Sequence, residues 1–311
     1  MKNFKKFISS CLFLVMLFSL AACSNKKTDS SKTKEDTKIS YPLKIKDSYD
    51  REVSIEKEPA KIVSLAPNIT ETIFALGKGD KLVGKTDYCD YPEASKKIES
   101  VGGLKNPNIE KIAQLKPDLV VASTHFDKKV LQKLEALNIK TVVLYGKDNL
   151  DGAYSVIDKL GTILNAKEKS NEIVSSMKKK VESIKEKVKG KSTPSVYYVI
   201  SYGKFGDYTA GGDTFINELI ETAGGKNVAS DVKGWQYSIE KLIEKNPDIV
   251  ICSKYFDAKK GIENANGYKD LTAVKNNKLY EIDNNLLDRQ GPRLADGLEE
   301  LAKIIHPELF K

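Results

Sequence analysis

Along most of the chain, short apolar runs alternate with longer stretches in which apolar residues recur at helical spacing. The short runs are rich in β-branched residues, which is typical of strands buried on both faces; they lie at 62–65, 81–84, 119–123, 141–144, 196–200, 249–253 and 278–282. Helical spacing is found between them at 68–77, 109–116, 130–137, 214–223, 239–246 and 292–305. Residues 41–55 instead alternate around a Ser-Tyr-Asp turn and predict a small hairpin. Strands that alternate with helices predict an α/β fold with parallel sheets.

One helix-to-strand unit occurs twice. Residues 109–123 and 239–253 match at seven of fifteen positions without a gap, including Glu-Lys and Pro-Asp at the same offsets. Proline ends each helix, and an apolar strand follows. Two amphipathic units can match by chance, but the shared offsets favour two similar lobes within one chain.

A long helix separates the two copies. Between 154 and 189 no strand pattern occurs, and apolar residues recur at helical spacing at Ile173, Val174, Met177, Val181, Ile184 and Val188. We expect one amphipathic helix of about 20 residues, or about 30 Å, at 167–189. The prediction is therefore two similar Rossmann-like lobes bridged by a long α-helix, with a ligand cleft between the lobes. The expected boundaries are 41–150 for the N-terminal lobe, 151–191 for the linking helices and 192–311 for the C-terminal lobe.

The first residues have the pattern of a secretory signal. Three lysines precede an apolar segment that ends in Leu-Ala-Ala-Cys. This ending resembles the lipobox of bacterial lipoproteins, which implies a signal peptide at 1–22 and a lipid on Cys23. An ordinary signal peptide with an incidental cysteine is the alternative. Residues 23–40 are polar and predict a disordered tether, so we expect a lipid-anchored protein on the extracytoplasmic face of the cell membrane.

Charge and cysteine content narrow the partners. The formal charge of +8 falls to +5 without the three signal lysines, and this excess is suited to anionic lipid headgroups. No basic stripe with interleaved aromatic residues is found, so nucleic acid is not an expected partner. Cys89 and Cys252 are expected to be free thiols, because one cysteine per lobe does not form a disulfide framework.

Catalytic and metal-binding patterns are weak, so the expectation is no enzyme, no catalytic residue and no resident metal. The chain contains no nucleophile elbow, phosphate loop or His-Glu-x-x-His sequence, and its two histidines cannot form a three-histidine site. His125 follows a predicted strand at the end where ligands bind open α/β sheets. It is either an exposed loop residue or an axial ligand to the metal of a bound macrocycle. Asp87 and Asp90 are interpreted as turn residues beside a proline.

Large apolar side chains gather in predicted loops at strand ends. Each one alone is more often a packing residue, but together they favour a cleft for a large, flat, partly apolar ligand: Tyr88, Tyr91, Leu104, Tyr208, Trp235, Leu286 and Leu287.

Several of these segments resemble a known family. The segments 62–71, 87–92, 101–103 and 108–112 are similar to the periplasmic binding proteins of ABC importers for vitamin B12, haem and iron-siderophores. Asp-Tyr-Cys-Asp-Tyr-Pro at 87–92 is most like the cobalamin-binding branch. The resemblance covers most of 41–311 and implies two α/β lobes joined by a stiff helix, with little motion on binding. It implies a monomeric protein that delivers cobalamin or a related corrinoid to a dimeric ABC permease.

The resemblance also implies roles for individual residues. Tyr88 corresponds to a corrin-contacting tyrosine and Trp235 to a ligand-contacting tryptophan, while Tyr208 stands where the family has phenylalanine. Leu104 and Leu286 stand where the cobalamin branch can have tryptophan, so the identity of the corrinoid stays open. Arg289 and Arg293 match a basic segment near the cleft mouth.

Two further classes of function remain open. Haem would require a ligand such as His125, and anionic siderophores prefer clusters of arginine, of which the chain has only three. A surface chelatase or corrinoid-modifying enzyme on the same fold is the alternative from another class.

The repeat contains two candidate docking residues. Glu110 and Glu240 occupy the same position in the two copies, in the first turn of a helix, where a carboxylate stabilises the helix dipole. In the resembled family, glutamates at these positions meet arginines on the two permease subunits. The resemblance therefore implies that these two residues dock the protein on its permease.

Overall fold

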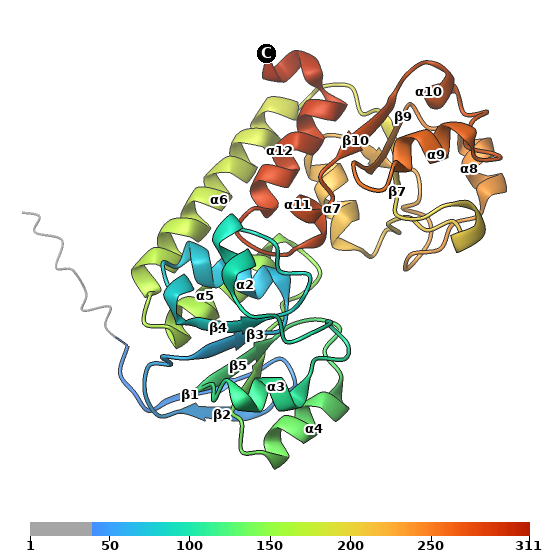
Figure 1. Cartoon of the computed structure of the whole chain (residues 1–311). Coiled ribbons are helices and arrows are strands. Elements are labelled where there is room, and N and C mark those ends of the chain that lie inside the picture. Colours follow the sequence, from blue (N-terminus) through green and yellow to red (C-terminus); the bar gives the residue numbers. More distant parts are fainter. Residues whose placement is uncertain (1–38) are drawn as a thin grey trace, which may run out of the picture. The chain divides into compact units, whose positions relative to one another are not determined.

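The computed structural model describes residues 39–311, and the expected signal peptide, Cys23 and most of the tether lie outside this range. Two four-stranded parallel sheets organise the described residues (Figure 1). The first has the strand order β4-β3-β5-β6, formed by Leu82–Lys85, Ile62–Ser64, Leu119–Ala122 and Thr141–Val143. The second has the order β10-β9-β7-β8, formed by Leu279–Ile282, Ile249–Ser253, Ser195–Val199 and Lys226–Asn227. We call the parts around these sheets the N-lobe and the C-lobe.

The two sheets have the same connectivity. In each, the first strand in the chain pairs with the second on one side and with the third on the other, and the fourth strand follows the third. Every pairing between these strands is parallel. The predicted α/β fold of two similar lobes is therefore confirmed.

The repeated segments form equivalent elements. Helices α3 (Ile109–Gln114) and α8 (Ile239–Lys245) precede β5 and β9. The aspartate of each Pro-Asp pair binds the start of the neighbouring strand: the Asp118 carboxylate accepts from the amides of Ala60 and Lys61 at 2.9 Å, and the Asp248 carboxylate accepts from the amide and hydroxyl of Ser195. These hydrogen bonds lower the pKa of both aspartates. The repeat thus fixes the register of β3 against β5 and of β7 against β9.

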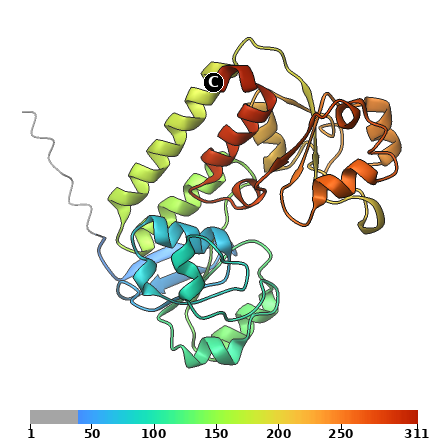
Figure 2. The same ribbon diagram turned by 45° about the horizontal axis from the view of Figure 1, so that its top comes forward.

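Two helices connect the lobes. The predicted long helix is α6 (Lys167–Val188), and α5 (Leu150–Ile163) precedes it. Helix α5 packs Val156 and Leu160 into the N-lobe core and Ala153 and Ile157 into the C-lobe core. Both views show α6 beside the last long helix, α12 (Leu294–Ile305) (Figures 1 and 2), and the two helices are in contact. One continuous apolar packing therefore joins both lobes to the linking helices.

The remaining elements cover the sheets and their edges. The predicted hairpin is formed by β1 (Leu43–Lys46) and β2 (Glu52–Ile55), which pair antiparallel. The other helices are α2 (Pro67–Ala75), α4 (Lys128–Ala136), α7 (Phe215–Thr222), α9 (Ala258–Asn264), α10 (Thr272–Lys275) and α11 (Asn285–Asp288). Short 3-10 helices occur at Gly79–Lys81, Glu93–Lys97, Gly203–Phe205 and Pro307–Phe310. No helix within 39–311 combines the length and the apolar character that crossing a membrane requires.

Two local expectations were wrong. The helical spacing predicted a start at residue 68, but α2 begins without a side-chain cap at Pro67, whose fixed φ suits a first helical residue. Leu286 and Leu287 are not in a loop but on the short helix α11, where Leu287 is fully buried in the C-lobe core.

Candidate functional site

A cavity of about 570 Å³ lies between residues that follow the carboxyl ends of strands in both sheets. The N-lobe contributes the ends of β3, β5 and β6, and the C-lobe contributes the ends of β7, β9 and β10. The lining is Ala66, Pro67, Asn68, Tyr88, Leu104, Ser123, Thr124, His125, Tyr145, Gly146, Asp148, Val156, Tyr198, Val199, Ile200, Phe215, Ile216, Trp235, Ser253, Asn284, Asn285, Asp288, Arg289 and Gln290. This is the position where open α/β sheets bind ligands.

Five sequence-predicted residues lie in this lining. Tyr88 and Leu104 come from N-lobe loops, Trp235 and Arg289 from the C-lobe, and His125 from the loop after β5. Tyr88 is 57% exposed and Trp235 is 43% exposed, although both are large aromatic side chains. Exposed aromatic rings at a cavity provide apolar surface that a ligand can cover.

Tyr208 and Leu286 are not part of the lining. The strand-like segment around Tyr208 pairs with Ser201 and with Gln236, whose side-chain amide donates to the Tyr208 hydroxyl at 3.3 Å. Tyr208 is therefore next to the Trp235 segment. Leu286 is partly buried on α11.

His125 is exposed and has a left-handed backbone, with φ at 66°. Its location agrees with both interpretations of its role, the exposed loop residue and the axial ligand. Among residues 39–311, no group of three or more histidine, cysteine, aspartate or glutamate side chains is placed to hold a metal ion.

Neutral amide and hydroxyl groups form much of the polar lining. Asn68, Asn284, Asn285 and Gln290 contribute side-chain amides. Ser253 donates to Asn284 Oδ1 at 2.7 Å in the C-lobe. The charged lining residues are Asp148, Asp288 and Arg289.

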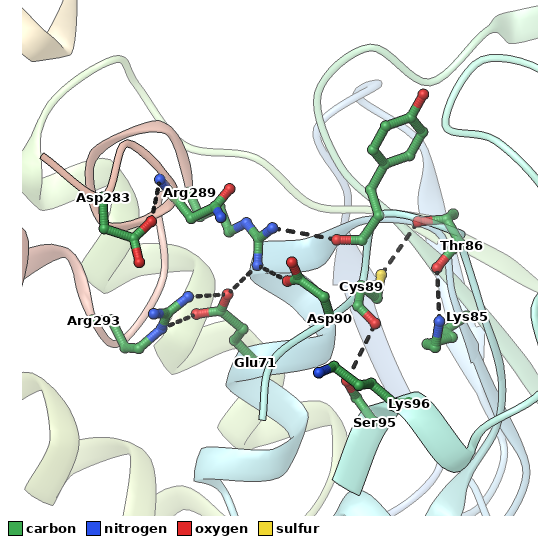
Figure 3. A network of polar contacts seen from close by, with 12 residues as sticks. Glu71, Lys85, Thr86, Cys89, Asp90, Ser95, Lys96, Asp283, Arg289 and Arg293 are labelled. Atoms are coloured by element: carbon green, nitrogen blue, oxygen red, sulfur yellow. Dashed lines mark hydrogen bonds and ion pairs between the residues drawn. The ribbon is translucent and has the colours of Figure 1, made fainter. Parts of the chain in front are cut away.

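Arg289 is already engaged by carboxylates (Figure 3). Its Nη1 atom is 2.9 Å from Oε1 of Glu71 and 2.6 Å from Oδ1 of Asp90. Arg293 binds Glu71 through two nitrogens, with Nε to Oε2 at 2.8 Å and Nη2 to Oε1 at 2.7 Å. The Arg293 guanidinium also lies 3.8 Å from the centre of the Tyr91 ring. The basic segment near the cleft is thus a set of ion pairs between the lobes.

These ion pairs shift the pKa values of Arg289 and Asp90. Burial lowers the pKa of Arg289, but hydrogen bonds from its guanidinium to Asp90 and Glu71 outweigh this and raise it above the ordinary value. Burial raises the pKa of Asp90, but Arg289 more than compensates and holds it below its ordinary value. Asp90 and Arg289 therefore stay charged near neutral pH.

Contacts with neighbouring residues also fix the loop at 87–92. Cys89 is fully buried, with its sulfur 3.2 Å from Thr86 Oγ1, and its carbonyl accepts from the Ser95 hydroxyl at 3.1 Å (Figure 3). Cys89 and Cys252 are both free, as expected. Burial raises the pKa of the Cys252 thiol to about 12, which makes it unreactive near neutral pH.

Glu110 and Glu240 are both exposed in the first turns of equivalent helices. Asn108 and Ser238 cap these helices by accepting from the amides of Lys111 and Lys241. The Ser238 hydroxyl donates to Glu240 and lowers its pKa. Both carboxylates are therefore available to a partner.

Sequence reasoning missed several residues at this site. Asn284 and Asp148 follow the ends of predicted strands and Ser253 is the last residue of one, so counting polar residues at and just after each strand end could have found them. Tyr198 was hidden because it lies within an apolar strand. Glu71 could be suspected as a charge within an apolar helix, but its partners are more than 200 residues away.

Two similar lobes, a linking helix and a cavity between them define a binding protein. The family model "Periplasmic binding protein" matches residues 62–286, and the chain belongs to this family. It is thereby a substrate-binding protein and not an enzyme. Its partners are a ligand and an ABC permease.

Individual relatives refine this assignment. The chain is 38% identical over 306 residues, 96% of each chain, to the uncharacterized ABC transporter substrate-binding lipoprotein YvrC of Bacillus subtilis. It is similar to a possible iron-binding periplasmic solute-binding protein from Staphylococcus epidermidis, with a TM-score of 0.71 and 32% identity over 80% of this chain and 100% of that one. It is also similar to the periplasmic vitamin B12 binding protein BtuF of Vibrio cholerae, with a TM-score of 0.69 and 26% identity over 81% of this chain and 98% of that one.

Proposed function

We propose that this protein captures cobalamin or a related corrinoid outside the cytoplasm and delivers it to an ABC permease. The observation that supports this ligand is the chemistry of the cavity. Among residues 39–311, its lining combines exposed aromatic rings with neutral carboxamides and includes no cation that lacks an ion-pair partner. A corrinoid offers an apolar ring edge and a periphery of neutral carboxamides, which are complementary partners for such a lining.

The charge balance of the lining argues against an anionic ligand. The lining residues, all within the described part of the chain, include no lysine and one arginine. Arg289 already has two carboxylate partners, and Asp148 and Asp288 add negative charge. Carboxylate-bearing ligands are usually bound by free arginines, because an unpaired anion loses its hydration on binding.

Haem is the second candidate, and His125 supports it. This histidine lies in the lining and is exposed, so its imidazole could coordinate iron. The propionates of haem would then need cations from outside the lining. A ferric siderophore with carboxylates or catecholates meets the same difficulty.

The ligand-binding set that we propose includes residues inside and beside the cavity. Tyr88, Leu104 and Trp235 would contact the ring, and Tyr208 would support Trp235. Arg289 would lie next to the ligand while it keeps its ion pairs with Glu71 and Asp90. Leu286, which is on α11 and outside the lining, would support the lining residues from behind.

We also propose the organisation of the whole chain. A signal peptide at 1–22 would be removed, and a lipid on Cys23 would anchor a tether at 23–40. The units would be 41–150, 151–191 and 192–311. The amide of Ile39 donates to Asn165 Oδ1 at 3.1 Å, so the tether would join the folded part at the turn between α5 and α6. The similarity to an ABC lipoprotein supports a location on the outer face of the cell membrane.

Docking is proposed through the repeated glutamates. Glu110 and Glu240 are exposed at equivalent positions of the two lobes, so they could meet equivalent arginines on two permease subunits. Such a pair would fix the orientation of a monomeric protein on a dimeric permease.

Absorbance and mass spectrometry test the ligand assignment. The purified full-length chain is incubated with cyanocobalamin, with hemin or with a ferric catecholate siderophore and then separated from free ligand. We expect corrinoid absorbance and a one-to-one mass only with cyanocobalamin. Retention of hemin or siderophore in its place would show that the ligand assignment is wrong while leaving the family assignment intact.

A further inference from the structure

The segment 288–293 of the C-lobe contacts three separate parts of the N-lobe. Arg289 and Arg293 bind Glu71 on α2, and Arg289 also binds Asp90 in the loop after β4. The side chain of Gln290 donates to Asp148 after β6 at 3.3 Å. These partners lie 142 to 222 residues apart in the chain. One short C-lobe segment therefore contacts helix α2 and two loops of the N-lobe next to the cavity.

We call Glu71, Asp90, Arg289 and Arg293 the charged bridge (Figure 3). It contains two carboxylates and two guanidiniums, so its formal charge is zero. The Glu71 side chain is only 2% exposed, and Arg289 and Arg293 are 10% and 18% exposed. Glu71 accepts three hydrogen bonds, two of them from Arg293 in a bidentate arrangement.

Because these charges are buried, their ion pairs favour one position of the two lobes relative to each other. If one lobe moved away from the other, Glu71 would stay on α2 while both arginines left with the C-lobe. Buried charges that lose their partners are strongly unfavourable until water reaches them. The bridge thus resists small opening motions more steeply than an apolar contact of the same size.

The charged bridge also orients a side of the binding cavity. Arg289 Nη2 donates to the Tyr88 carbonyl at 3.3 Å, and the Tyr91 ring stacks on Arg293. Both aromatic residues belong to the loop at 87–92, from which the Tyr88 side chain reaches the cavity lining. Tyr88 is 57% exposed, so few contacts of its own hold it in place, and the hydrogen bond to its carbonyl contributes to its position.

We infer that the charged bridge holds the lobes at one opening before any ligand binds, and that Glu71 is a positioning residue for the cavity. Helices α5 and α6 connect the lobes through the chain, and the charged bridge is a further connection at the cavity wall. This added connection restricts rotation of one lobe on the other. Part of the ligand affinity would then come from preorganisation.

Inter-lobe distances test this inference without any ligand. Lys133 on α4 and Lys260 on α9 are exposed and belong to different lobes. In the full-length chain each is replaced by an azide-bearing residue that accepts a spin label, and the distance distribution is measured by double electron–electron resonance. We expect a narrow distribution for the otherwise wild-type chain and a broader one for Glu71→Gln. An unchanged distribution in Glu71→Gln would overturn the inference.

A matched control separates positioning from general stability. Asp47 is a fully buried carboxylate that pairs with Arg51, but both partners belong to the N-lobe. Asp47→Asn should lower the melting temperature as Glu71→Gln does and leave the distance distribution unchanged. Equal broadening in both variants would contradict the inference. If Glu71→Gln fails to fold, the double variant Glu71→Gln with Arg293→Gln removes both charges together and is measured in its place.

A second readout rests on the proposed function. With cyanocobalamin as the probe, Glu71→Gln should bind about tenfold more weakly or worse, and Asp47→Asn should bind as the wild type does. If the wild-type chain does not bind cyanocobalamin, the proposed ligand is wrong, but the distance measurement still decides the role of the charged bridge.

Discussion

The exposed surface of Trp235 allows a quantitative prediction of how much this residue contributes to ligand affinity. The chain contains one tryptophan, which is in the cavity lining and is 43% exposed. A tryptophan offers about 250 Å² of surface, so roughly 110 Å² is free for a ligand to cover. At about 25 cal/mol per Å², full coverage contributes about 2.7 kcal/mol and half coverage about 1.3 kcal/mol. Trp235→Ala should therefore weaken ligand binding by about tenfold to a hundredfold.

Calorimetric titration of the wild-type and variant chains with cyanocobalamin measures this difference. Phe205→Ala is the matched control, because Phe205 is a C-lobe aromatic residue that is 72% exposed and lies outside the lining. The control variant should bind as the wild type does. A Trp235→Ala affinity within twofold of wild type, or an equal loss in Phe205→Ala, would refute the reasoning from covered area.

Three further predictions concern acid stability, packing and docking. Burial raises the pKa of Glu58, but two lysine partners more than offset this and bring it from 4.5 to about 2. The stability that Glu58 contributes is therefore fully present above about pH 4.5 and is lost as the pH falls towards 2, so denaturant unfolding of Glu58→Gln should differ from wild type at pH 7 and converge with it near pH 2. A Cβ on Gly152 would collide with the backbone of Lys147, so Gly152→Ala should lower the free energy of unfolding by about 1–3 kcal/mol, and an unchanged melting temperature would contradict this. Replacing Glu110 and Glu240 by alanine should reduce uptake by cells, most in the double variant, at unchanged ligand affinity; loss of ligand binding as well would exclude a docking role.

Much of the fold could be predicted because burial on both sheet faces leaves a strong signal. Leu119–Ala122 is wholly apolar and Ile62–Ser64 is fully buried, and both became central strands. The repeat found in the sequence corresponds to equivalent helices and strands of the two sheets. The apolar stripe that includes Met177, Val181 and Ile184 is the buried face of α6.

Short and polar elements left too little signal. Strand β8 contains only Lys226 and Asn227, so no alternation could be recognised. Helix α11 has four residues and begins within an Asp-Asn-Asn sequence that is typical of a turn. The start of α2 was misplaced because Pro67 determines it without a side-chain cap.

The site could be predicted only in part, for a physical reason. Large aromatic residues in predicted loops are unusual, and this position identified Tyr88 and Trp235 as candidate ligand-binding residues. The partners of Arg289 could not be foreseen, because an ion pair between residues 218 positions apart depends on how the two lobes meet. The sequence placed Arg289 only in a basic segment near the cleft mouth, whereas in the structure two carboxylates bind it.

Tryptophan fluorescence can test whether the cavity prefers a neutral corrinoid to an anionic macrocycle. Because Trp235 is the one tryptophan and lies in the lining, its fluorescence reports contact with a bound chromophore. The full-length chain is titrated in parallel with cyanocobalamin and hemin at the same ionic strength, and the two dissociation constants are compared. We expect saturable quenching at a lower concentration of cyanocobalamin than of hemin. Tighter quenching by hemin, or none by cyanocobalamin, would contradict it.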